Sequence, residues 1–94
     1  MTTPIDSASV LTISAGYRLQ FEESQDKWVL LYPEGMVKLN PSAAEILKRC
    51  DGQRSLAEVI RQLEEEFQQT GLESDVLSFA QIALEQKWIK IANG

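Results

Sequence analysis

Residues 27–41, with the sequence KWVLLYPEGMVKLNP, contain the change from strand to helix that decides the fold. Residues 27–32 are aromatic and aliphatic on both faces, which is typical of the central strand of a small sheet. Residues 33–35 have turn chemistry, and residues 36–39 then predict a short antiparallel strand at an edge of the sheet. The Asn-Pro pair at residues 40–41 supplies an N-cap and a proline at the first helical position, so a helix is predicted to begin here.

Upstream of this stretch, residues 17–21 alternate apolar and polar side chains with the period of a half-buried strand. Residues 1–15 are rich in Ser, Thr and Ala and show no sustained periodicity. We therefore expect a flexible N-terminal arm over residues 1–15 and one folded domain over residues 16–94. A chain of 94 residues has room for a single domain with a small core.

Downstream, the pattern predicts three helices. The first begins at residues 40–41 and is short, and Ser55 with Glu58 forms a capping box for the second. The third is predicted to begin near residue 74 or 75 and to run to about residue 87, followed by a brief strand or an extended tail at residues 88–91. The expected fold is therefore α+β and winged-helix-like, with a three-stranded antiparallel sheet followed by three helices.

The composition excludes several classes of function. The chain has no histidine and a single cysteine, Cys50, so an imidazole metal site, a Ser-His-Asp triad and an internal disulfide are not expected. No nucleophile is paired with a base, and we expect neither an enzyme nor a cofactor. The net charge of −5 opposes contact with nucleic-acid phosphates. No signal peptide or long apolar run is present, so we expect a cytoplasmic protein with no membrane partner.

Two predicted elements are incompletely covered. Phe79 and Ile82 lie off the main apolar stripe of the third helix, so they either extend the core or line a groove for a partner. The edge strand at residues 36–39 presents backbone groups that can accept an extended peptide as an added strand. Alternatively, the N-terminal arm covers this edge. The residues by themselves leave both alternatives open.

Several short motifs follow one another along the chain. They are WVLLYPEG at residues 28–35, VKLN at 37–40, AEIL at 44–47, DG at 51–52, and Asp75, Val76 and Phe79 in the third helix. Their order and spacing resemble the PqqD family of pyrroloquinoline quinone biosynthesis, over about residues 17–91. The resemblance implies a peptide-recognition domain without chemistry of its own. Such a domain would bind the precursor peptide PqqA and present it to the radical S-adenosylmethionine enzyme PqqE.

The same resemblance implies where the peptide binds. It would add as a strand to the edge at residues 36–39 and lie in a groove walled by the third helix. The peptide-binding residues expected on this basis are Met36, Val37, Lys38, Leu39, Asp75, Val76, Phe79, Ile82 and Ala83. Asp75 is expected chiefly to cap its own helix. If the peptide adds as a strand, Val37→Pro is expected to abolish binding.

The main alternative is a winged-helix DNA-binding regulator, because three helices and a hairpin can place a recognition helix in the major groove. Residues 74–86 contain no Lys or Arg, which argues against this alternative. A homodimer, in which a second copy of the chain fills the groove, is a further alternative that the open strand edge would permit.

Overall fold

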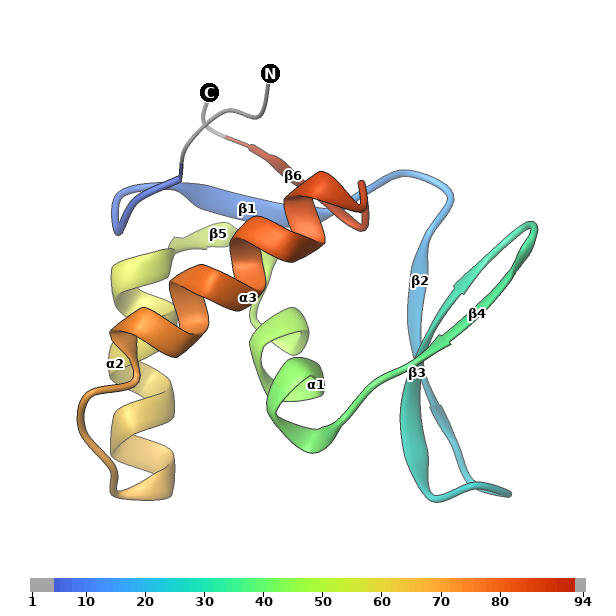
Figure 1. The fold of residues 1–94 in the computed structure, drawn as a ribbon, viewed down its shortest axis with the longest axis horizontal. Coiled ribbons are helices and arrows are strands. Elements are labelled where there is room, and N and C mark those ends of the chain that lie inside the picture. The colour runs from blue at the N-terminus through green and yellow to red at the C-terminus, as the bar shows by residue number, and fades with distance from the viewer. Residues whose placement is uncertain (1–4, 93–94) are drawn as a thin grey trace.

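The computed structural model describes residues 5–92 of the chain (Figure 1). Six strands and three helices occur within those residues. In chain order they are β1 (Val10–Ile13), β2 (Arg18–Glu22), β3 (Lys27–Tyr32), β4 (Gly35–Lys38), α1 (Pro41–Lys48), β5 (Asp51–Ser55), α2 (Leu56–Phe67), α3 (Glu73–Glu85) and β6 (Ile89–Ile91).

The predicted sheet is present as β2-β3-β4, with β3 in the centre. Strands β2 and β4 both run antiparallel to β3. Arg18 of β2 lies opposite Leu31, and Gly35 of β4 lies opposite Tyr32. Val29 and Leu30 of β3 point to opposite faces, and both are fully buried. The apolar pattern on both faces of residues 27–32 correctly indicated a central strand.

The predicted helix starts are also confirmed. The Asn40 side chain accepts a hydrogen bond of 2.7 Å from the backbone N–H of Ala43, so the chain turns from β4 into α1 within two residues. At the start of α2, Ser55 and Glu58 form the reciprocal bonds of a capping box. These bonds satisfy backbone groups that have no partner within the helix.

The prediction of a loose arm over residues 1–15 is wrong for residues 10–13. These residues form β1, the central strand of a second sheet with the order β5-β1-β6. Leu11 of β1 is 1% exposed and packs in the core. The folded unit therefore begins before residue 16. Residues 1–4, which were also assigned to the arm, lie outside the described residues.

The second sheet escaped prediction because its strands are short and come from distant parts of the chain. β5 has the sequence DGQRS, which contains no apolar residue, and it pairs with β1 at Val10↔Ser55 and Thr12↔Asp51. The brief strand predicted near the C-terminus is confirmed as β6. The α+β class is thus confirmed. The winged-helix likeness is loose because a second sheet, β5-β1-β6, packs against α2 and α3, while the predicted sheet packs against α1 (Figure 1).

One hydrophobic core joins the helices and both sheets. Its largest fully buried side chains include Leu11, Leu30, Leu47, Leu56 and Ile89. Helix α3 contributes Val76, Ala80 and Ala83 and packs chiefly against α2 and β6. Among the described residues, no helix has the length and apolar character needed to cross a membrane.

Candidate functional site

The backbone of β4 has a free edge. The N–H of Leu39 donates to the carbonyl of Trp28 at 3.0 Å, which places Leu39 at a hydrogen-bonded position of the β3–β4 ladder. Hydrogen-bonded and non-bonded positions alternate in an antiparallel pair, so Val37 also bonds toward β3. The N–H and C=O groups of Met36 and Lys38 therefore point away from the sheet.

The described part of the N-terminal segment does not cover this edge. Ser9 accepts a backbone hydrogen bond from Leu56, and Ser14 donates one to Trp88, each at 2.9 Å. Between them, β1 pairs with β5 and β6. Within residues 5–92, no strand adds to the outer side of β4. This edge is available to accept a strand from a partner.

The side chains of β4 alternate between two environments. Leu39 is 6% exposed and Val37 is half-buried, and both pack toward the core. Met36 is 41% exposed and Lys38 is also exposed, so these two lie on the opposite face of the sheet. Of the four residues predicted on this strand, Leu39 supports the strand from inside rather than presenting a side chain to a partner.

The predicted residues of α3 divide in the same way. Val76 and Ala83 are buried in the core, at 2% and 0% exposed. Ile82 is 52% exposed, Phe79 is half-buried and Asp75 is exposed. Because residues three and four apart share a helix face, these last three form one accessible stripe along α3. Of the two alternatives for Phe79 and Ile82, full burial in the core does not hold for Ile82.

Asp75 does not have the capping role expected for it. The N-cap position of α3 is Leu72, and no side chain caps this end by a hydrogen bond. Asp75 lies within the first turn of the helix, where its negative charge interacts favourably with the helix dipole. Within the described residues, its carboxylate forms no ion pair, so the charge is available at the surface.

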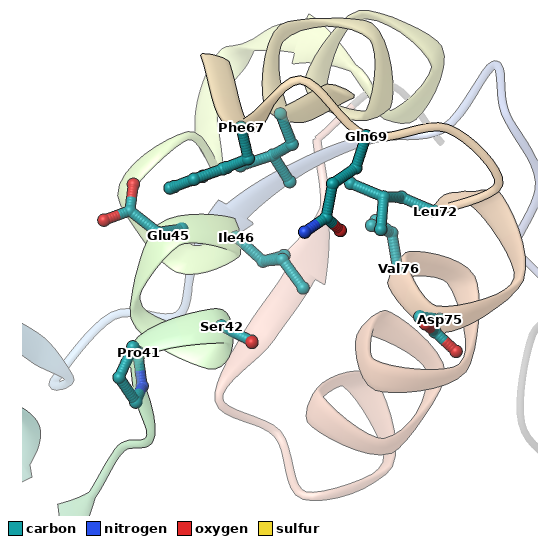
Figure 2. A pocket seen from close by; sticks show the side chains of 10 residues that line it. Pro41, Ser42, Glu45, Ile46, Phe67, Gln69, Leu72, Asp75 and Val76 are labelled. Atoms are coloured by element: carbon teal, nitrogen blue, oxygen red, sulfur yellow. The ribbon is translucent and has the colours of Figure 1, made fainter. Parts of the chain in front are cut away.

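A hollow of about 290 Å³ lies between α1, the end of α2 and the start of α3 (Figure 2). We call it the helical hollow. Its lining residues are Pro41, Ser42, Glu45, Ile46, Leu63, Phe67, Gln69, Leu72, Asp75 and Val76. Asp75 and Val76 were predicted site residues, but the others were missed.

Phe67 illustrates why the hollow was missed. It continues the helical spacing of the buried stripe of α2, which predicts burial, yet it is 47% exposed. It is the last residue of α2, beyond the point where the core covers that helix. Its position at the helix end, directly before the polar run at residues 68–70, was the available signal.

The charges around the hollow are unequal. Glu45 forms ion pairs with Lys48 at 2.9 Å and Arg49 at 2.8 Å. Burial acts to raise the pKa of Glu45, but the hydrogen bonds from Arg49 and Lys48 outweigh it and hold the pKa below its usual value. The charge of Glu45 is thus compensated by two cations, whereas that of Asp75 is not.

The structure brings only some of the predicted site residues together in one place. Asp75 and Val76 line the hollow together with Pro41 and Ser42 at the start of α1, the helix that follows β4 in the chain. Met36 and Ile82 do not line it. Helix α3 packs chiefly on α2 and β6, and β4 packs chiefly on β3. The candidate site therefore consists of an open strand edge and an accessible helix stripe, with the helical hollow at one end.

The site offers free backbone groups on β4 and accessible apolar side chains on α3. In residues 5–92, no cluster of three or more His, Cys, Asp or Glu side chains is suitably placed for a metal ion. Burial and the nearby charge of Asp51 raise the pKa of the Cys50 thiol to about 12. Because the thiolate is the nucleophilic form of cysteine, Cys50 is unreactive at neutral pH.

Known proteins share this sequence over most of its length. The chain is 48% identical over 86 residues to a "PqqA binding protein" of Klebsiella pneumoniae, a match that covers 90% of this chain and 94% of that protein. It is 50% identical over 84 residues to a protein of the same description from Pseudomonas paraeruginosa, with 88% and 91% covered.

A solved structure also shares the fold. The solution NMR structure of the PqqD truncation of Methylobacterium extorquens PqqCD, described as a functional and stand-alone RiPP recognition element, superposes with a TM-score of 0.78. The two chains are 25% identical, and the match covers 92% of this chain and 94% of the other. The family described as "Coenzyme PQQ synthesis protein D (PqqD)" matches residues 27–89. This chain therefore belongs to the PqqD family.

Proposed function

We propose that this chain binds the precursor peptide PqqA by strand addition to the free edge of β4, beside α3, and presents it to the radical S-adenosylmethionine enzyme PqqE. The observation that carries the proposal is the outward direction of the backbone groups of Met36 and Lys38. Relatives described as PqqA binding proteins support the identity of the peptide.

Backbone pairing by itself would bind a short peptide weakly, because each hydrogen bond contributes only about 0.5–1.5 kcal/mol net. Apolar contacts must supply the rest. Phe79 and Ile82 are the anchors we assign, since both are accessible on the stripe of α3. Val37, Val76 and Ala83 would form the base of the groove, and Leu39 would hold the strand in place from within the core.

Alternation along a strand sets the pattern of the bound peptide. Peptide residues on the same face as Val37 would point toward the helices, where apolar side chains are favoured. The intervening residues would lie beside Met36 and Lys38, on the exposed face of the sheet. An acidic peptide side chain at that position would pair with Lys38.

The role we propose is one of presentation rather than catalysis. The relatives are described as binding proteins, and the buried thiol of Cys50 is held in its unreactive form. A cytoplasmic location and a homodimer that closes the groove in the absence of peptide both stay predictions. Light scattering of the purified chain and of its mixture with PqqA and PqqE would test the homodimer and the ternary complex together.

A backbone amide NMR titration with the PqqA peptide of Klebsiella pneumoniae would test the binding mode. We expect the largest shifts at Met36 and Lys38 and along residues 73–86. Lys38→Pro removes an outward N–H, and proline is tolerated at such edge positions, so this variant should fold and lose binding. Unchanged affinity of folded Lys38→Pro would contradict strand addition.

A further inference from the structure

The helical hollow is lined largely by apolar side chains. Ile46, Leu63 and Val76 line the hollow and are each less than 7% exposed. The half-exposed ring of Phe67 stands at its side (Figure 2). Its volume of about 290 Å³ is near the lower end of pockets that enclose small-molecule ligands, which begin at about 300 Å³. The hollow therefore fits one or two amino-acid side chains.

Its position follows from the end of β4. Helix α1 begins at Pro41, where the backbone leaves the extended conformation, so a strand ladder on the edge of β4 cannot continue along α1. A peptide added to β4 must leave the sheet at this point. Pro41 and Ser42 line the hollow, so one wall of the hollow follows directly after the end of β4 in the chain.

The charge near the opening indicates the chemistry of the occupant. Glu45 is already paired with Lys48 and Arg49, whereas Asp75 has no ion pair within the described residues. Helix α3 carries acidic residues in its first turn and no Lys or Arg along its length. A positively charged group at this rim would be attracted, and a second negative charge would be repelled.

We propose that the helical hollow holds a bulky apolar side chain of the peptide that adds to β4, and that a neighbouring Lys or Arg of the same peptide pairs with Asp75. This inference rests on the proposed function. It extends the site from the sheet edge to α1 and α2 and specifies an apolar residue next to a cation as the recognised feature.

The test is calorimetric titration of the whole chain with the PqqA peptide of Klebsiella pneumoniae. Ser42→Leu puts bulk into the hollow from an exposed position and should weaken binding about tenfold or more. Asp75→Asn should weaken it about two- to fivefold and reduce its salt dependence. Glu73→Gln removes a carboxylate from the same turn of α3 without touching the hollow, so it should bind like the parent.

Changes to the peptide identify the cation. Each Lys or Arg of the peptide is replaced by glutamine in turn, and the replacement that removes the partner of Asp75 should abolish the difference between the parent chain and Asp75→Asn. If no replacement does so, the proposed ion pair is wrong.

The outcomes separate this inference from the proposed function. A parent chain that does not bind PqqA overturns both. Parent binding that Lys38→Pro weakens and Ser42→Leu leaves unchanged overturns the hollow but retains strand addition. If the parent is a dimer in light scattering, Ser42→Leu is a folded monomer, and the peptide does not shift that equilibrium, a second copy occupies the hollow and the inference fails.

Discussion

The backbone nitrogen of Leu39 lies 3.0 Å from the carbonyl oxygen of Trp28, and this hydrogen bond shows which backbone groups of β4 face away from the sheet. Hydrogen-bonded positions alternate along the strand. The backbone N–H and C=O of Val37 therefore face β3, and those of Met36 and Lys38 face outward. A proline at residue 37, which the sequence indicated as the test of strand addition, would instead break the existing sheet.

Proline substitutions on β4 should accordingly differ in stability. Val37→Pro removes a donor from the β3–β4 ladder and should lower the free energy of unfolding by about 1–3 kcal/mol. Lys38→Pro removes an N–H that no strand within residues 5–92 uses, so it should lower the free energy of unfolding less. Urea unfolding of both variants measures this difference, and the opposite order would show that the assignment of outward groups is wrong.

Exposed and buried positions of α3 should separate binding from stability. Ile82→Ala should change the free energy of unfolding by no more than about 0.5 kcal/mol, because Ile82 is 52% exposed, but should weaken PqqA binding. Val76→Ala, at a residue 2% exposed, should lower the free energy of unfolding by about 1–3 kcal/mol. Denaturation and calorimetry on the same samples test both. Equal binding by Ile82→Ala and the parent would remove Ile82 from the site.

The N-terminal strand should be essential to the fold. Leu11→Ala removes a side chain that is 1% exposed at the centre of the second sheet and should lower the free energy of unfolding by about 2–5 kcal/mol. Substitution of the exposed Ala8 by serine serves as a nearby control, with little expected effect. A Leu11→Ala variant as stable as the parent would support the loose arm that the sequence suggested.

The capping box of α2 should contribute measurably. Ser55→Ala removes the acceptor for the Glu58 backbone N–H, which lies 3.3 Å away, and should cost about 0.5–2 kcal/mol. Ser78→Ala changes an exposed serine within α3 and is the matched control. The midpoint of urea unfolding should fall for Ser55→Ala at unchanged slope. Equal midpoints for the two variants would contradict a stabilising cap.

Cys50 should make stability depend on pH in the alkaline range. Its pKa is about 12 in the folded chain against 9.0 for an ordinary thiol, so between these values the unfolded chain binds fewer protons than the folded one. The free energy of unfolding should then fall as pH rises above 9.0. Cys50→Ala lacks this contribution, so the stability difference between parent and variant should shrink over that range. A constant difference would show that the thiol is not held protonated.

Local sequence patterns correctly predicted several elements of the fold. The apolar run at residues 27–32, the Asn40-Pro41 pair and the capping box at Ser55 each act through their nearest neighbours in the chain. The structure confirms a central strand and two helix starts at these positions. β1 and β5 pair across a long separation, and neither shows a period of its own over its short length.

For the site, the sequence by itself determined the local features. These are a short edge strand, an acidic third helix without Lys or Arg, and apolar residues on that helix outside its main apolar stripe. Only the tertiary structure decided that β1 pairs with β5 and β6, leaving the edge of β4 open, and that Val76 and Ala83 are buried while Ile82 is exposed. The helical hollow likewise exists only after α1, α2 and α3 have packed. Hydrogen-bond direction and exposure depend on which distant segments pack together, and no local pattern encodes that choice.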